Sequence, residues 1–198
     1  MSDHSDPVAD LAYIRSIMER SRSALAENGL GYILFGLSSV VCTGFSYLLG
    51  FLGWSAWIWT PWVFVFGGTS LVVWRLMAGR HRPANSGQVG RLLAAIWGGI
   101  TIFSIAACML LGFLGRIGLG AELCICGLAL GLGYFLSGTL IGIAWLRNLS
   151  SLWLVGSGGL LFFPDLAAPA VFAGMVLLLE VVPGFLLRAR YRKQHGSA

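Results

Sequence analysis

Six long apolar runs follow one another along this chain of 198 residues and constrain its fold more than any other feature. A helix needs about 20 apolar residues to cross the hydrocarbon core of a bilayer. Five of the six runs are long enough by themselves. The other one, residues 149–163, has 15 residues and fits either a short helix in a thinned bilayer or a re-entrant segment. The sequence therefore predicts an all-α, polytopic transmembrane helical bundle over residues 30–187, with spans at 30–53, 56–78, 92–115, 121–146, 149–163 and 166–187.

Composition supports a boundary with lipid. Hydrophobic residues make up 57% of the chain and charged residues 11%, whereas water-soluble domains average about 45–50% apolar and about 25% charged residues. The formal net charge is +5, but no basic stripe is interleaved with aromatic residues as in nucleic-acid-binding proteins. We therefore expect the lipid bilayer, and no nucleic acid, among the partners of this chain.

The positions of the basic residues predict the orientation. With six spans and a cytosolic N-terminus, 12 of the 13 lysines and arginines fall in cytosolic segments, and Arg116 alone falls outside. If residues 149–163 do not cross, four basic residues in the tail 188–198 move to the outside. Cytosolic segments of membrane proteins are rich in Lys and Arg. The charge distribution thus favours six spans, with both termini in the cytoplasm and a basic cytosolic tail at 188–198.

Residues 1–29 are predicted to form a cytosolic leader that contains an amphipathic helix. Asp6-Pro7 is a favourable helix start, and Asn28-Gly29 is expected to end the helix before the first span. Between them, four apolar residues recur at helical spacing on one face, opposite charged residues. This face is the candidate docking surface for a protein partner, and its residues are Leu11, Ile14, Met18 and Leu25.

The leader also resembles a known sequence type. Ile14-Arg15, Met18-Glu19 and Ser21 form an IRxxMExS pattern directly before the first span. This is similar to the start of certain uncharacterised bacterial multi-pass inner-membrane proteins, and the similarity covers about the first fifth of the chain. The resemblance implies a bacterial cytoplasmic membrane and carries no activity.

Glycine is abundant, with 28 residues, and in the predicted fourth span it forms small-xxx-small pairs. Such stripes let helix backbones approach closely, which drives helix association in lipid. We expect the stripe to pack against another helix, either within the bundle or in a homo-oligomer. Its members are Gly127, Gly131, Gly138 and Gly142.

Glu180 is the candidate functional residue. It precedes Arg188 by eight residues, so it lies roughly 12 Å inside the cytosolic boundary at about 1.5 Å per residue. Ionisable groups at that depth usually face the bundle or a water-filled path. Pro183 removes the backbone donor for the carbonyl of Leu179, so the helix is expected to be interrupted beside the carboxyl group. The two residues are the transport candidates, and the alternative is a Glu180 that only fixes helix packing.

The remaining chemistry-bearing residues do not form a catalytic or metal-binding pattern. Cys124 and Cys126 are two apart on a helix and point in different directions. With Cys42 and Cys108, they are expected to pack as small apolar groups. The three histidines fall in polar segments, and Asp165 follows Pro164 in a turn. We expect no metal, no cofactor and no enzymatic activity.

Two functions remain. The first is a non-enzymatic membrane protein that acts by association with a partner or as a subunit of a membrane assembly, through its leader helix. The second is a small transporter or channel for an ion or small solute that uses Glu180 within the bilayer. The sequence alone does not decide between them.

Overall fold

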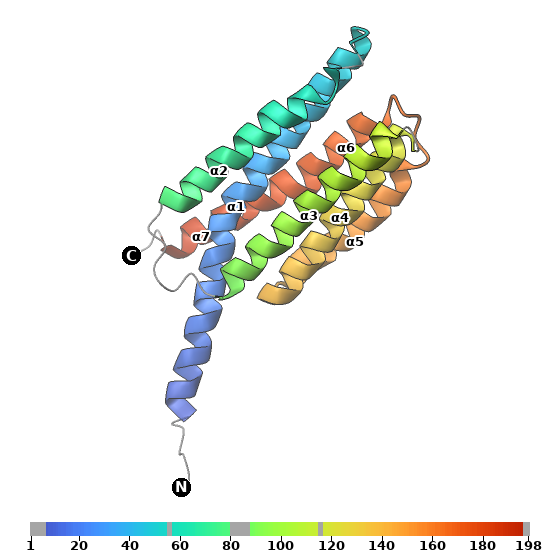
Figure 1. Cartoon of the computed structure of the whole chain (residues 1–198). Helices are drawn as coiled ribbons and strands as arrows, with labels where there is room; N and C mark the ends of the chain where they lie inside the picture. Colours follow the sequence, from blue (N-terminus) through green and yellow to red (C-terminus); the bar gives the residue numbers. More distant parts are fainter. Residues whose placement is uncertain (1–6, 55–56, 80–87, 115–116, 196–198) are drawn as a thin grey trace.

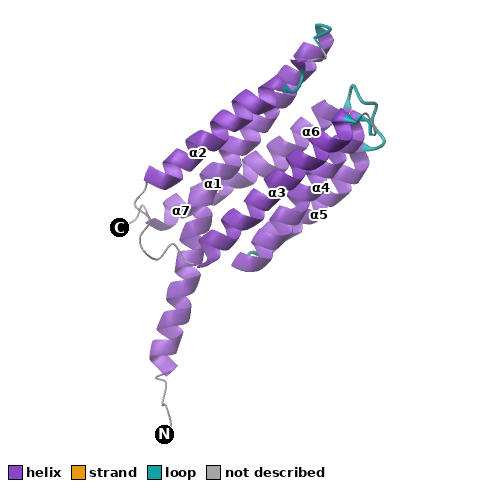
Figure 2. Cartoon of the chain, viewed as in Figure 1, coloured by secondary structure: helices purple, strands orange, loops and turns teal. Residues whose placement is uncertain are grey.

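The computed structural model describes residues 7–54, 57–79, 88–114 and 117–195. Every regular element in these ranges is helical, and no strand occurs among them (Figure 2). The prediction of an all-α helical bundle is therefore confirmed for the described part of the chain.

The helices follow the apolar runs in order. The chain forms α1 (Pro7–Phe51), a π-helical segment η2 (Trp62–Phe66) that continues into α2 (Gly67–Gly79), and α3 (Gln88–Phe113). It then forms α4 (Leu119–Ile141) and α5 (Ala144–Leu160). A last rod consists of α6 (Ala168–Val176), a second π-helical segment η3 (Leu177–Val181) and α7 (Val182–His195).

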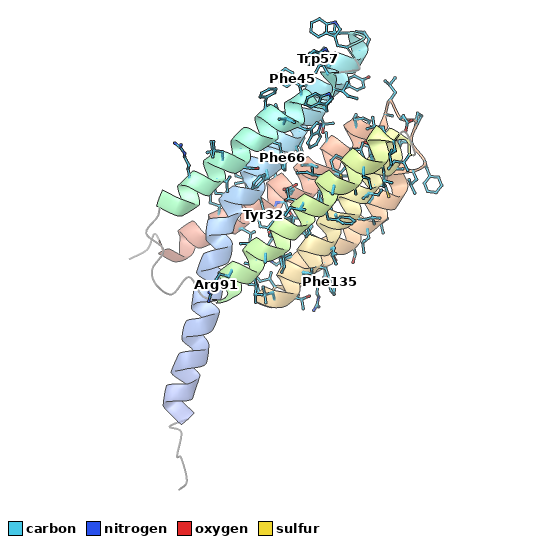
Figure 3. All side chains as sticks on the ribbon, in the orientation of Figure 1. Tyr32, Phe45, Trp57, Phe66, Arg91 and Phe135 are labelled. Atoms are coloured by element: carbon cyan, nitrogen blue, oxygen red, sulfur yellow. The ribbon has the colours of Figure 1, made fainter. Side chains whose placement is uncertain are left out.

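Four stretches are long and apolar enough to cross a membrane, namely Gly29–Phe51, Gly90–Cys108, Leu119–Ile141 and Ala168–Ala189. A shorter apolar helical stretch covers Trp62–Val73, and α5 has 17 residues. The helices run side by side and alternate in direction (Figure 1). Arg91 therefore lies at the end of the bundle near both termini, and Trp57 lies at the opposite end (Figure 3).

The expected break at Asn28-Gly29 is wrong, because α1 continues through it for 45 residues. Gly29 is buried against the last rod instead: a Cβ atom added to it would lie 3.1 Å from the carbonyl oxygen of Gly184. A glycine that could end a helix is used here for close helix contact, which keeps α1 straight into the bundle. The leader is thus a continuation of the first membrane-length helix, and the side chains of Leu11, Ile14, Met18 and Leu25 lie outside the described residues.

The predicted fourth span, 121–146, is also wrong at its end. Gly142 has φ +74°, and its N–H and that of Ile143 bond back to the carbonyls of Thr139 and Gly138, which closes α4 at Ile141. Glycine adopts this left-handed conformation without the steric cost of a Cβ. Because α5 begins at Ala144, the residues from Ala144 to Leu146 belong to the fifth helix, which is correspondingly longer than the predicted 15-residue run.

Large apolar side chains cover much of the outer surface. Phe51, Phe64 and Val155 are 80%, 74% and 76% exposed, and many similar residues on α1 to α6 are exposed as well. Water-soluble monomers rarely expose contiguous apolar area on this scale. The surface therefore matches a lipid environment, as the composition predicts.

Candidate functional site

The last rod widens into a π-helical turn where it carries Glu180. In segment η3 the N–H of Val182 bonds to the carbonyl of Leu177, five residues earlier. Pro183 follows directly, and its ring would collide with the carbonyl of Leu179 in an ordinary α-helix. The wider turn accommodates that ring, so the helix is continuous rather than interrupted. Such turns are frequent at functional sites in membrane and soluble proteins.

Glu180 is 4% exposed and lies against α1. A Cβ atom added to Gly36 would lie 3.5 Å from its carboxyl carbon and would collide with Val181. Glycine at position 36 therefore makes room for the last rod to reach α1. No hydrogen bond or ion pair to the carboxylate occurs within the described part of the chain.

A column of aromatic side chains crosses the bundle beside this carboxylate. Tyr32 of α1 stacks on Tyr134 of α4 with ring centroids 5.4 Å apart. Trp97 of α3 meets both rings edge to face, at 5.2 Å and 5.6 Å. Tyr134 continues to Trp153 of α5, and Trp153 to Phe172 of α6, at 6.3 Å and 6.2 Å. Edge and offset contacts of this kind add to the energy of burial, so the column joins five helices at mid-height, where Figure 3 places Tyr32.

Several polar atoms in and beside this column are buried and poorly satisfied by the protein. The hydroxyls of Tyr32, Tyr134 and Ser137 form no hydrogen bond of ordinary geometry with a described residue, and the same holds for Trp153 Nε1 and Ser157 Oγ. Ser137 and Trp97 lie beside the Tyr32 hydroxyl, and Glu180 lies in the same region of the bundle as both tyrosines. Buried polar groups in native proteins nearly always have a partner. Glu180 and these hydroxyls are therefore the candidates in this region for binding a polar ligand.

The predicted glycine stripe faces α5 over most of its length. Added Cβ atoms would collide with Ser157 at Gly127 and would lie 3.1 Å from the Cβ of Trp153 at Gly131. At Gly138 the added atom would lie 2.5 Å from the backbone nitrogen of Arg147. A Cβ atom added to Gly142 would meet nothing within 4 Å, and this glycine serves the turn described above. The stripe thus holds the α4–α5 hairpin together within one chain.

At the other end of the bundle, the acidic and sulfur-bearing residues make contacts that the sequence did not predict. The carboxylate of Asp165 accepts a hydrogen bond of 3.1 Å from the N–H of Gly120 in the first turn of α4, so it caps a distant helix as well as standing in a turn. Cys124 and Cys126 diverge as expected, but the sulfur of Cys126 meets that of Cys108 on α3 at 3.1 Å. No group of three or more His, Cys, Asp or Glu side chains suited to a metal ion occurs among the residues described.

The sequence indicated Glu180 and Pro183 but not their neighbours. Tyr32, Tyr134 and Ser137 come from helices that are far apart in the sequence, so no local spacing joins them. The available signal was the position of Tyr134 and Ser137 near the middle of an apolar run, where a polar atom is expensive to bury. That signal places the two residues at the right depth but does not give the helix face or the partner.

Comparisons of this chain with protein-family models, with curated proteins and with solved structures found no match.

Proposed function

We propose that this protein is a small membrane transporter or channel in which Glu180 binds a proton or a monovalent cation on its way through the bundle. The observation that carries the proposal is a buried carboxylate, Glu180, in the same region of the bundle as the buried hydroxyls of Tyr32, Tyr134 and Ser137. Intramembrane acids of this kind commonly lie on ion and proton pathways.

The charge of Glu180 and the neighbouring hydroxyls define the class of ligand that this site can bind. A single carboxylate supplies one negative charge, which matches a proton or a monovalent cation, and hydroxyl oxygens can complete the shell around either. The π-helical turn Leu177–Val181 also makes the backbone around Glu180 wider than the α-helices on either side. The carboxylate and the π-helical turn both lie on the last rod, which packs against α1 at Gly36, so relative movement of these two helices would change access to the carboxylate.

The experiment is a flux measurement on purified protein in proteoliposomes that enclose a pH indicator, for protons, or a sodium-sensitive dye, for sodium ions. An imposed potassium diffusion potential drives protons or sodium ions, and the initial rate is compared between wild type and variants. We expect Glu180→Gln, which keeps the shape and removes the charge, to abolish the flux. Glu122→Gln changes a less buried carboxylate near the other end of the bundle and serves as the matched control that retains it.

A chemical label supplies a second readout. Dicyclohexylcarbodiimide modifies carboxyl groups in apolar surroundings, so we expect it to label Glu180 and to stop the flux, with protection by the transported cation. Wild-type protein that conducts neither ion would contradict the proposal. So would a Glu180→Gln variant with undiminished flux.

A second function is favoured by the shape of α1. Its first 22 residues, 7–28, precede the membrane-length stretch that starts at Gly29 and project beyond the other helices (Figure 1). At about 1.5 Å per residue this arm is roughly 33 Å long. Amphipathic helices of this kind dock into apolar grooves of partner proteins or lie on a membrane surface.

The docking face predicted for this arm is tested by charge insertion. We expect Met18→Asp to release a protein that co-purifies from gently solubilised membranes, while Ser16→Asp, on the opposite face of the helix, leaves it bound. Retention of every partner by Met18→Asp would remove the docking function and leave the transport proposal intact.

The proposed orientation has six crossings with both termini in the cytoplasm. The distribution of arginines supports it: Arg91 near the start of α3 and Arg147 near the start of α5 lie at the end of the bundle to which both termini return. The resemblance around Ile14–Ser21 to certain bacterial inner-membrane proteins supports a bacterial cytoplasmic membrane as the proposed location. Reporter fusions after Phe163 and at Ala198 test the arrangement, and an external C-terminus would overturn it.

A further inference from the structure

Two cysteine side chains from neighbouring helices meet within the described part of the chain. The sulfur of Cys108 on α3 is 3.1 Å from the sulfur of Cys126 on α4. A disulfide bond has a sulfur–sulfur distance of about 2.03–2.05 Å, so about 1 Å of further approach would join them. Cys108 also contacts the backbone carbonyl of Glu122, one turn before Cys126, at 3.9 Å, which orients its thiol toward α4.

The pair differs from the other cysteines in accessibility. Cys42 and Cys124 are buried, and the sulfur of Cys42 contacts the carbonyl of Pro61 at 3.3 Å. Cys108 and Cys126 are only half-buried. They lie roughly 8–10 Å from the ends of α3 and α4 that face away from the chain termini. By residue exposure, the pair is therefore more accessible than Cys42 and Cys124 to a reagent dissolved in the apolar phase.

We propose that Cys108 and Cys126 form a reversible dithiol–disulfide site that fastens α3 to α4. The oxidant is a two-electron acceptor of the quinone class, which dissolves in the same apolar phase. Two S–H bonds break and one S–S bond forms, while both protons and two electrons pass to the quinone to give the hydroquinone. The orientation proposed above places the pair nearer the oxidising side of the membrane, where disulfides persist.

Oxidation at this site would act on the least buried of the four membrane-length stretches. Among the membrane-length stretches, the one in α3 has the smallest buried share, 11%. It packs on α4 through Trp97 and Ile100, which fill the space left by Gly133. A bond between Cys108 and Cys126 would fix the other half of α3 and so remove its freedom to separate from α4.

The test uses the full-length protein in native membrane vesicles. The vesicles are treated with tetramethyl-1,4-benzoquinone, whose fully substituted ring resists thiol addition, and in parallel with copper–phenanthroline in air. Remaining thiols are then alkylated in detergent, and the protein is digested with trypsin. Arg116 lies between the two cysteines, so cleavage separates peptide 92–116 from peptide 117–147 unless a disulfide joins them.

We expect most of the wild-type protein to yield the joined peptides, lighter than their sum by two hydrogen atoms, and a dithiol reductant to separate them. Cys124→Ser should behave as wild type, and Cys126→Ser should yield none. Free peptides from wild type under both oxidants, with both thiols alkylated, would overturn the proposal. A joined product in Cys126→Ser, formed through Cys124, would overturn it equally.

Discussion

Replacing Gly138 by Ala tests the packing of the α4–α5 hairpin directly. The added Cβ would lie 2.5 Å, 2.8 Å and 2.9 Å from the backbone nitrogen, Cα and Cβ of Arg147. Two of these are backbone atoms only a few residues beyond the turn at Gly142 and Ile143, so no side-chain rotation relieves the overlap. The two helices must instead move apart by several tenths of an ångström to 1 Å.

The cost follows from that displacement. Overpacking by a single methyl group typically destabilises a close-packed site by about 1–3 kcal/mol. The upper part of that range applies here because the neighbouring residues, Gly131 and Gly127, contact the same helix and lose their fit as it shifts. We therefore expect Gly138→Ala to lower the free energy of unfolding by about 2–3 kcal/mol.

Gly98→Ala is the matched control. Gly98 lies in the interior of α3, and an added Cβ meets nothing within 4 Å. Alanine has a higher helix propensity than glycine by about 1 kcal/mol. This variant should therefore be as stable as wild type or more stable by up to about 1 kcal/mol, so the same chemical change has opposite signs at the two positions.

The assay is unfolding in mixed micelles of a mild detergent with increasing sodium dodecyl sulfate, followed by tryptophan fluorescence. Trp153 lies on the α4–α5 contact and is fully buried; because the chain has eight tryptophans, the difference in emission between wild type and Trp153→Phe reports separation of these helices. Equal midpoints for Gly138→Ala and wild type would refute the packing argument. Equal destabilisation by Gly138→Ala and Gly98→Ala would show that glycine matters through helix flexibility and not through contact.

Two further predictions use the same assay. Asp165→Ala removes the carboxylate that accepts a hydrogen bond from the Gly120 N–H and should lower the free energy of unfolding by about 1 kcal/mol. Asp165→Asn keeps an acceptor and should lower it less. An Asp165→Ala variant as stable as wild type would show that the bond does not stabilise α4. Tyr134→Phe deletes a buried hydroxyl without a protein partner, so stability should stay within about 1 kcal/mol of wild type or rise, while proton or sodium flux falls. A marked loss of stability in the Phe variant would show that this hydroxyl is bonded within the fold rather than free to serve the site.

The apolar runs alone determined the helical class and the approximate position of each helix, because twenty or so apolar residues in lipid must satisfy their backbone groups within one helix. They also predict that Glu180 lies well inside the last membrane-length stretch, since its distance from Arg188 along the helix is fixed. The turn between α4 and α5 was misplaced because Gly142 lies inside a continuous apolar run, and hydropathy does not respond to a left-handed glycine. The continuation of α1 through Gly29 was missed for a related reason: whether a glycine ends a helix or packs against another depends on what lies beside it.

Only the tertiary structure decided which residues meet. It stacked Tyr32 on Tyr134 in the same region of the bundle as Glu180. It also brought the sulfur of Cys108 to that of Cys126, although Cys124 is closer to Cys108 along the sequence. The physical reason is that lipid makes every apolar helix face nearly equivalent, so hydrophobicity fixes the depth of a side chain but not its direction around the helix axis. That direction is set by close backbone contacts, such as those at Gly36 and Gly138, which exist only once the helices have packed.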